Sequence, residues 1–337
     1  MRLALAAAAF QILALGWMAG ARETIAVTGT PVYLRTAPVD PRDPFRGDYL
    51  TLRYPFNEVR LAKVQGDLRV RHPRGAPVYA ALKEAPGGLH ELDHLSSEPP
   101  PRGLYLRGRV ENDWRTESLS VKYGLEAYFT QQGKAAKLEQ RMRGSEGVQV
   151  PLEMRVAISS SGTGVLTGHR WCDLGMGLEI LEAAGRESER DADAKKPPAR
   201  RSAKVKLRLM NASTQPKALV LLPEMRSIIL APADGEAENW SLPNRAAPPP
   251  APRAEDIVLL QPGEEHALVI DLADKAWLVK NGEAPGEIGA LSPGERFRLI
   301  YTPPDPEICK ELPQRDLIWH GQLPSRAFSG SGVLGWD

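Results

Sequence analysis

Short apolar runs with strand-like alternation recur between about residue 24 and residue 170, and turn-forming residues separate them. In residues 49–54, for example, Leu50, Leu52 and Tyr54 share one face, as in a half-buried strand. This pattern predicts a β-rich domain over residues 24–170, with one short helix over residues 131–142. The predicted strands are residues 24–28, 31–35, 49–54, 67–70, 77–82, 103–110, 148–158 and 164–169, with a further strand starting at residue 118.

A second series of strand-like runs follows residue 172. Val205 and Leu207 alternate with Lys and Arg residues, which is the pattern of a strand with one buried face. The spacing predicts a β-sandwich over residues 172–337, interrupted by an exposed, mobile loop at residues 185–202, which are rich in both charges. The predicted strands are residues 174–181, 203–210, 218–222, 227–230, 256–260, 266–272, 296–301 and 317–320.

The chain opens with an uncharged, largely apolar segment, residues 3–21, between Arg2 and Arg22. As a helix it would extend about 28 Å, enough to cross the core of a bilayer. Ala19-Gly20-Ala21 also fits the small-residue rule for signal cleavage. Residues 1–22 are therefore predicted to be a transmembrane anchor or a cleaved signal peptide, with the remaining chain outside the cytoplasm.

Composition restricts the function more than it defines it. The 337 residues carry 43 Lys and Arg against 42 Asp and Glu, a balance that argues against a general nucleic-acid binder. The sequence contains no Walker A loop, GxGxxG fingerprint, HExxH motif or GxSxG elbow. We therefore predict no cofactor and lean against an enzyme.

The two cysteines, Cys172 and Cys309, exclude a disulfide framework and a cysteine-based zinc site. In an oxidising compartment they could form one disulfide with each other, and two separate thiols are the alternative. His90 and His94 have metal-ligand spacing only if they lie on a helix, whereas the turn signals around them favour an exposed loop. We accordingly predict no metal site.

The most informative segment is residues 38–54, PVDPRDPFRGDYLTLRY. Residues 47–54, GDYLTLRY, match every fixed position of the motif that names the bacterial GDYXXLXY protein family. Residues 123–129 also resemble a segment of that family, so the resemblance covers about residues 1–170. It implies a membrane-associated protein with an extracytoplasmic β-rich domain, and it implies no reaction. The second half resembles, more weakly, the immunoglobulin-like sandwich domains of exported bacterial proteins, through its turns at residues 211–213, 262–265, 292–295 and 319–321.

Two interpretations of the segment stay open. Its alternating acidic and basic residues can pair with one another and fix the start of a strand. The same groups can shift one another's pKa or bind a polar ligand. The candidate functional and motif residues are Asp40, Arg42, Asp43, Arg46, Gly47, Asp48, Tyr49, Leu52, Tyr54, Tyr123, Glu126 and Tyr128.

The sequence favours a non-enzymatic protein tethered to the inner membrane through residues 3–21, with its bulk in the periplasm. Its expected role is binding or scaffolding, with a protein partner in the cell envelope and no nucleic acid. The alternative is an envelope hydrolase or peptidase-like enzyme, or a ligand or metal binder, that uses the region of Asp48.

Overall fold

The structure is a computed structural model in which part of the chain is described. The described residues are 2–36, 49–66, 73–112, 118–130, 134–143, 147–182, 203–233, 250–272, 274, 277–281, 284–287 and 296–329. The predicted strand at residues 67–70 and the predicted mobile loop at residues 185–202 lie outside them. The chain forms two units: unit 1 is Met1–Ala136 with Leu152–Trp171, and unit 2 is Lys137–Pro151 with Cys172–Asp337.

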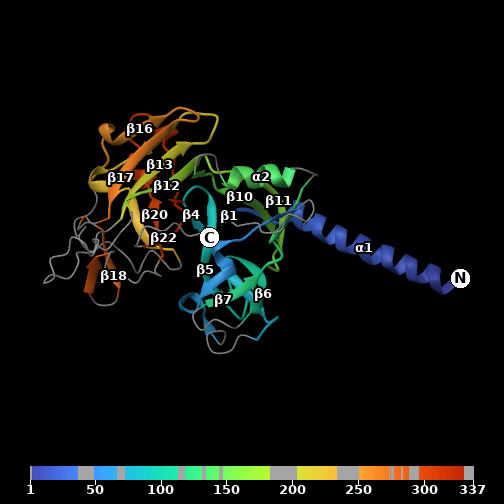
Figure 1. The fold of residues 1–337 in the computed structure, drawn as a ribbon. Helices are drawn as coiled ribbons and strands as arrows, with labels where there is room; N and C mark the ends of the chain where they lie inside the picture. Colours follow the sequence, from blue (N-terminus) through green and yellow to red (C-terminus); the bar gives the residue numbers. More distant parts are fainter. Residues whose placement is uncertain are drawn as a thin grey trace. The chain divides into compact units, whose positions relative to one another are not determined.

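Unit 1 contains the long helix α1 (Arg2–Thr28) and most of the β-structure predicted for the first half of the chain (Figure 1). Its strands are β1 (Thr30–Arg35), β2 (Tyr49–Thr51), β3 (Glu58–Arg60), β4 (Pro77–Ala85), β5 (Leu89–Ser96), β6 (Leu104–Asn112), β7 (Ser118–Lys122), β8 (Ala127–Phe129), β10 (Leu152–Ile158) and β11 (Gly164–Trp171). Over the described residues, they form an eight-stranded sheet in the order β11-β10-β1-β5-β4-β6-β7-β3, with β2 and β8 as a separate pair. The prediction of a β-rich first half is confirmed.

The eight-stranded sheet curls so that the turn between β10 and β11 reaches β6. The backbone N–H of Arg107 donates to the Gly162 carbonyl at 2.7 Å, and the Tyr105 hydroxyl donates to the Ser160 carbonyl at 3.0 Å. Gly162 has φ +80°, and a Cβ there would lie 2.4 Å from the Tyr105 ring. Only glycine fits this contact without displacing the ring.

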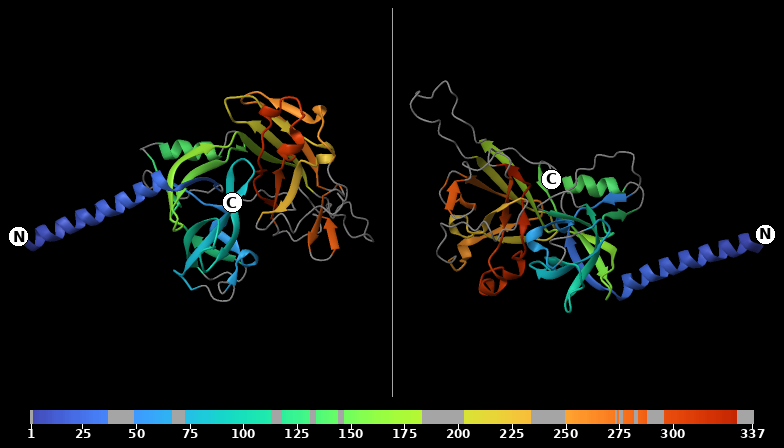
Figure 2. Two further views of the ribbon diagram at one scale, coloured as in Figure 1. Left: turned by 180° about the vertical axis from the view of Figure 1, so that it is seen from behind. Right: turned by 90° about the horizontal axis from the view of Figure 1, so that it is seen from below.

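Unit 2 contains the strands of the second series (Figure 2). They are β9 (Val148–Gln149), β12 (Leu174–Glu182), β13 (Lys204–Asn211), β14 (Lys217–Val220), β15 (Ile228–Pro232), β16 (Ile257–Leu260), β17 (Glu265–Asp271), β18 (Leu278–Asn281), β19 (Ala284–Glu287), β20 (Arg296–Tyr301), β21 (Leu323–Pro324) and β22 (Phe328–Ser329). The described part of unit 2 has one four-stranded sheet in the order β17-β13-β12-β9 and another that joins β15, β20, β21 and β22. Alternate residues of β13 and β20 are buried, as the sequence pattern predicts.

Two predicted strands are wrong. Residues 24–28 continue α1, where the hydroxyls of Thr24 and Thr28 donate to carbonyls one turn earlier at 2.8 and 2.7 Å. Extending a helix that has already formed fixes one residue per added bond, so β-branched residues can join it. Residues 317–320 contain the end of a 3₁₀ turn and a single bridge from Ile318 to Ala218.

The helix predictions have mixed outcomes. Helix α2 (Lys134–Arg143) confirms the short helix predicted near residues 131–142. The histidines predicted to lie in a loop, His90 and His94, instead lie in β5, a strand in which Leu89, Leu92 and Leu95 are buried. Within the part of the chain that is described, no helix combines the length and the apolar content that a membrane span requires.

Candidate functional site

Of the signature segment, residues 38–54, the described structure contains residues 49–54. Asp40, Arg42, Asp43, Arg46, Gly47 and Asp48 lie outside the described residues. Tyr49 begins β2, and Leu52 and Tyr54 follow that strand with 2% and 1% of their surface exposed. The geometry of the site therefore rests on residues 49–57 and on the segment that they contact.

Strand β2 pairs antiparallel with β8 and joins the signature segment to residues 123–129. Leu50 lies opposite Tyr128, and the Leu52 N–H donates to the Glu126 carbonyl at 2.8 Å. The two segments that carry the family resemblance are thus neighbours, although about 70 residues separate them in sequence. Among the candidate residues, Tyr49, Leu52, Tyr54, Tyr123, Glu126 and Tyr128 come from this one pair of segments.

Two buried tyrosines and Phe56 fill the space below the β2–β8 pair. The Tyr54 ring stacks on Phe56 with centroids 5.3 Å apart, and Phe56 meets the Tyr123 ring edge-on at 5.1 Å. The Tyr54 hydroxyl donates to the Leu125 carbonyl and the Tyr123 hydroxyl to the Phe56 carbonyl, both at 3.2 Å. Each phenol therefore ends on a backbone acceptor of the other segment.

Asn57 and Glu126 connect the same segments through their side chains. One Glu126 carboxylate oxygen, Oε1, accepts from the Tyr123 N–H at 2.7 Å and from Asn57 Nδ2 at 3.1 Å. Asn57 Oδ1 accepts from the Tyr54 N–H at 2.6 Å, and its Nδ2 also donates to the Val121 carbonyl at 2.8 Å. Sequence reasoning missed Asn57, and its position directly after Pro55-Phe56, where an amide can close a turn, is the signal that could have identified it.

The pKa values of the two tyrosines in this cluster indicate a structural role and not a role in proton transfer. Burial raises the pKa of both Tyr54 and Tyr123 well above the ordinary range, and the nearby Glu126 carboxylate raises both further. The two phenols therefore stay neutral and act as hydrogen-bond donors. A general base needs an accessible group with a pKa near neutrality, and neither tyrosine has these properties.

Tyr128 and His169 form the more open edge of the site. The Tyr128 hydroxyl lies 3.3 Å from His169 Nδ1, and the two rings meet edge-on at 5.6 Å. Partial burial lowers the pKa of His169, so its imidazole is neutral at pH 7. A neutral imidazole beside a phenol can bind a polar group through hydrogen bonds.

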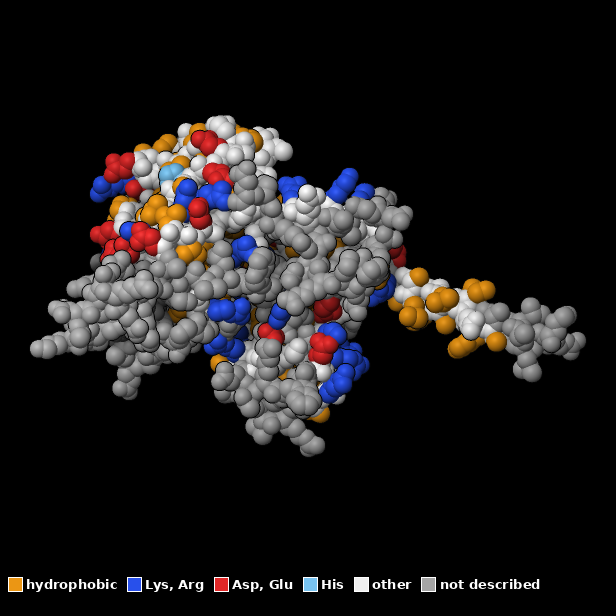
Figure 3. Space-filling view, viewed as in Figure 1, with side chains coloured by type: hydrophobic (Ala, Val, Ile, Leu, Met, Phe, Trp, Pro, Cys, Tyr) orange, Lys and Arg blue, Asp and Glu red, His pale blue; other side chains and the backbone are white. Residues whose placement is uncertain are grey.

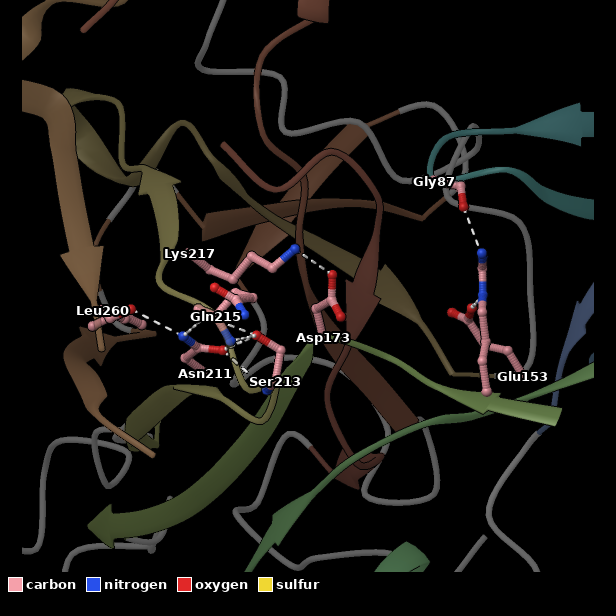
Figure 4. A network of polar contacts seen from close by, with 9 residues as sticks. Gly87, Glu153, Asp173, Asn211, Ser213, Gln215, Lys217 and Leu260 are labelled. Carbon is pink, nitrogen blue, oxygen red and sulfur yellow. Dashed lines mark hydrogen bonds and ion pairs between the residues drawn. The ribbon is translucent and has the colours of Figure 1, made fainter. Parts of the chain in front are cut away.

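Unit 1 also contains a buried charge cluster that the sequence did not indicate. Glu153, 3% exposed, accepts from Arg35 at 2.8 Å and from Arg170 at 2.7 Å. Arg170 also donates to the Gly87 carbonyl at 2.8 Å (Figure 4) and lies over the Tyr33 ring, 3.9 Å from its centroid. These paired charges hold β1, β10 and β11 together.

The described cysteines and histidines form no metal-binding cluster. Cys172 and Cys309 are both buried, and no disulfide joins them, so of the two alternatives the structure contains separate thiols. Burial raises the pKa of the Cys309 thiol, which packs in an apolar cluster with Ala218 and Val220. Among the described side chains, no group of three or more His, Cys, Asp or Glu residues is arranged to hold a metal ion.

The comparisons with known proteins give one result for the first half of the chain. Residues 11–168 match the model of the GDYXXLXY protein family. These residues include most of the β-rich first half and contain both resembling segments, so residues 11–168 form a GDYXXLXY domain. Neither the curated proteins nor the solved structures provide a match to the chain.

Proposed function

We propose that the protein is a membrane-tethered, extracytoplasmic binding or scaffolding protein, not an enzyme. One observation carries this proposal. The described part of the signature segment contacts residues 123–129 through groups that satisfy one another's hydrogen bonds, and the hydroxyls of Tyr54 and Tyr123 both donate to backbone carbonyls. A segment packed in this way supports a domain, whereas catalysis needs groups that can reach a substrate.

The exposed side chains of α1 support the tether. Figure 3 shows apolar side chains along this helix. Its large apolar residues include Phe10, which is 73% exposed, and Trp17, which is 80% exposed. Each large apolar side chain left in water forgoes about 1.5–3 kcal/mol of burial free energy. We propose that the inner membrane covers residues 3–21 and that the rest of the chain is periplasmic, with cleavage after Ala21 and release into the periplasm as the alternative.

Unit 2 supports the scaffolding part of the proposal. Its strands carry alternating buried residues on two separate four-stranded sheets over the described part of the chain. We propose that these sheets form an immunoglobulin-like sandwich, a module that presents loops to a protein partner in the envelope.

Protease treatment of bacterial spheroplasts tests the topology. The full chain, with a C-terminal epitope, is expected to be digested in intact spheroplasts while a cytosolic control protein survives. Carbonate extraction and the intact mass then separate an anchored chain from one cleaved after Ala21. Replacement of Leu13 and Leu15 by Glu should abolish export, and Gln11→Glu is the control on the same helix. Protection of the chain in spheroplasts, with digestion only after lysis, would contradict the proposal.

The hydrolase alternative depends on Asp48 and has its own test. If Asp48 is catalytic, Asp48→Asn abolishes the phenotype of the gene and leaves the thermal midpoint of the protein unchanged. Our proposal expects any loss of the phenotype to accompany a lower thermal midpoint, because the segment then acts by supporting the fold.

A further inference from the structure

One face of the eight-stranded sheet in unit 1 carries a cluster of guanidinium groups. Two adjacent rows of directly opposite residues cross β11, β10 and β1: Arg170, Glu153 and Arg35 in one row, and Gly168, Arg155 and Tyr33 in the next. Residues two apart on a strand share a face, so both rows lie on the same face of the sheet. The other face of these strands is the core, where Leu34 and Met154 have no exposed surface.

Three contacts hold Arg170 in place on this face. Its Nε donates to Glu153 at 2.7 Å, its Nη2 donates to the Gly87 carbonyl at 2.8 Å (Figure 4), and its guanidinium lies 3.9 Å from the centroid of the Tyr33 ring. Its second terminal nitrogen, Nη1, has no partner among the described residues, and 40% of the side chain is exposed. Arg170 is therefore fixed in position and still able to donate to a ligand.

Arg155 adds a second cation beside the first. It lies directly opposite Tyr33, the residue on which Arg170 stacks, and its side chain is exposed. Glu153, two residues earlier on β10, already pairs with Arg35 through Oε1 and with Arg170 through Oε2. Within the described part of the chain, no carboxylate pairs with Arg155. The cluster thus has three guanidiniums against one carboxylate, which leaves an excess of positive charge.

The two neighbours of Arg155 leave space and a donor for a ligand. On β11, a Cβ at Gly168 would have no heavy atom within 4 Å, so the surface beside Arg155 is open on that side. On β1, the Tyr33 ring supports Arg170, and its hydroxyl has no hydrogen-bond partner among the described residues. Donors from three adjacent strands therefore surround one open position.

We propose that Arg155, Arg170 and the Tyr33 hydroxyl bind a phosphoryl group. A tetrahedral phosphate presents oxygens in several directions and can accept from all three side chains, whereas a carboxylate presents only two oxygens in one plane. Guanidiniums bind phosphate through paired N–H groups, and a phosphate monoester carries enough negative charge to offset the excess of the cluster. This inference names a ligand class for the binding role proposed above and rests on that role, but it does not depend on where α1 lies.

Calorimetric titration of the full chain in dodecyl maltoside, a detergent without phosphate, tests the inference. The probe is glycerol 3-phosphate, with acetate and neutral glycerol as comparisons. We expect saturable binding of glycerol 3-phosphate that weakens as the salt concentration rises. Acetate should bind at least about tenfold more weakly, and glycerol should show no saturable binding. The absence of saturable glycerol 3-phosphate binding would overturn the inference, as would equal affinity for acetate.

The same titration in nanodiscs of phosphatidylcholine distinguishes two sources of the phosphoryl group. This lipid has a phosphate in its headgroup but no net charge, so the surface does not repel the probe. If headgroups occupy the site, glycerol 3-phosphate binds at least about tenfold more weakly in nanodiscs than in detergent, by competition. Equal binding in the two media identifies a soluble phosphate ester as the ligand. Both results support a phosphoryl site.

Four variants separate the site from general surface charge. Arg155→Gln should weaken binding by about tenfold, whereas Arg107→Gln removes an exposed guanidinium from β6 of the same sheet and should leave binding unchanged. Tyr33→Phe keeps the ring under Arg170 and removes only the hydroxyl, so it should weaken binding by about threefold to tenfold. Gly168→Glu places a carboxylate opposite Arg155 and should abolish binding, and a thermal midpoint close to wild type would show that it folds.

Equal effects of Arg155→Gln and Arg107→Gln would contradict the assigned site, as would full binding by Gly168→Glu. A failed titration leaves the spheroplast result intact, so the two proposals fail separately.

Discussion

Tyr54 and Tyr123 show how burial changes what a side chain can do. In water a phenol is a weak acid and a modest hydrogen-bond donor. Below the β2–β8 pair, burial raises the pKa of each phenol, and each hydroxyl has one backbone acceptor within 3.2 Å. The last tyrosine of the family motif therefore acts as a neutral connector between segments distant in sequence.

Removal of either connector should cost stability. Tyr54→Phe and Tyr123→Phe each leave a buried carbonyl without its donor, and each should lower the free energy of unfolding by about 1–2 kcal/mol. Tyr128→Phe is the matched control, because the Tyr128 hydroxyl bonds at the exposed edge, 3.3 Å from His169, and its loss should cost less than about 0.5 kcal/mol. Urea denaturation measures all three, and equal effects would contradict the connector role.

The lowered pKa values of two histidines predict that the free energy of unfolding falls in acid. Burial lowers the pKa of His169 and of His320, and for His320 the Asp305 carboxylate offsets part of this shift. The unfolded chain takes up these protons near pH 6.5, before the folded chain does. Their contribution to stability is therefore present above about pH 6.5 and is lost as the pH falls through the lower folded pKa values.

The double variant His169→Gln, His320→Gln isolates this effect from that of the carboxylates. Between pH 7.5 and pH 5, its urea midpoint should fall less than the midpoint of the wild type. An identical fall for the two proteins would show that the histidines do not contribute.

At the scale of elements, alternation predicted strands well where one face of the strand is buried. Residues 204–211 and 296–301 are strands in which alternate residues are buried. Their alternation of apolar and polar residues predicts this, because successive side chains of a strand point to opposite faces. Residues 24–28 were misassigned because β-branched residues favour strands locally, while the preceding turns of α1 impose helix. His90 and His94 were misassigned because the buried Leu89, Leu92 and Leu95 recur at every third position, which is not the alternation of a strand, and an irregularity in the pairing with β4 between Leu92 and His94 interrupts that alternation.

The turn between β10 and β11 depends on a single glycine. Gly162→Ala should lower the free energy of unfolding by about 2–4 kcal/mol, because the methyl group meets the Tyr105 ring in addition to the strain of a positive φ. Gly75→Ala is the control, since Gly75 has φ +82° and open space around its Cβ position. It should cost only about 1 kcal/mol. Thermal unfolding of both variants measures the difference, and equal costs would mean that the contact with Tyr105 contributes nothing.

At the scale of the whole molecule, the sequence identified the segments that meet and some of the groups that join them, namely Tyr54, Tyr123 and Glu126. The resemblance linked residues 47–54 and 123–129, and these segments are paired through β2 and β8. The turn position of Asn57 could have been noticed, but not its bond to the Val121 carbonyl, 64 positions away. The ion pair of the buried Glu153 with Arg35 spans 118 positions and leaves no local pattern. Nor did spacing show that β9 would pair with β12 in unit 2, since a two-residue strand carries almost no pattern.

The exposed half of α1 predicts the effect of truncation. Removal of residues 1–21 should yield a chain that stays monomeric without detergent and keeps its thermal midpoint within about 2 °C, because the large apolar side chains described in that half, such as Phe10, Leu13 and Trp17, are exposed. Removal of residues 1–29 is the comparison, since it also deletes the end of α1 that contacts β10 and β11, and it should lower the midpoint by several degrees. Size-exclusion chromatography measures the oligomeric state of both variants, and thermal unfolding measures their midpoints. A large loss of stability on removal of residues 1–21 alone would contradict this description.

Gly29 is the single residue between α1 and β1, and a Cβ there would lie 2.6 Å from the Ile25 carbonyl oxygen and 3.0 Å from the Ile158 N–H nitrogen. An extended residue spans only about 3.3–3.6 Å, so this junction has almost no slack. If α1 lies in a bilayer, as proposed, this short junction would hold the first domain next to the lipid headgroups and restrict its movement away from the membrane. A ligand or partner of this domain would then have to bind close to the membrane surface. A long insertion after Gly29 would let the domain move farther from the membrane.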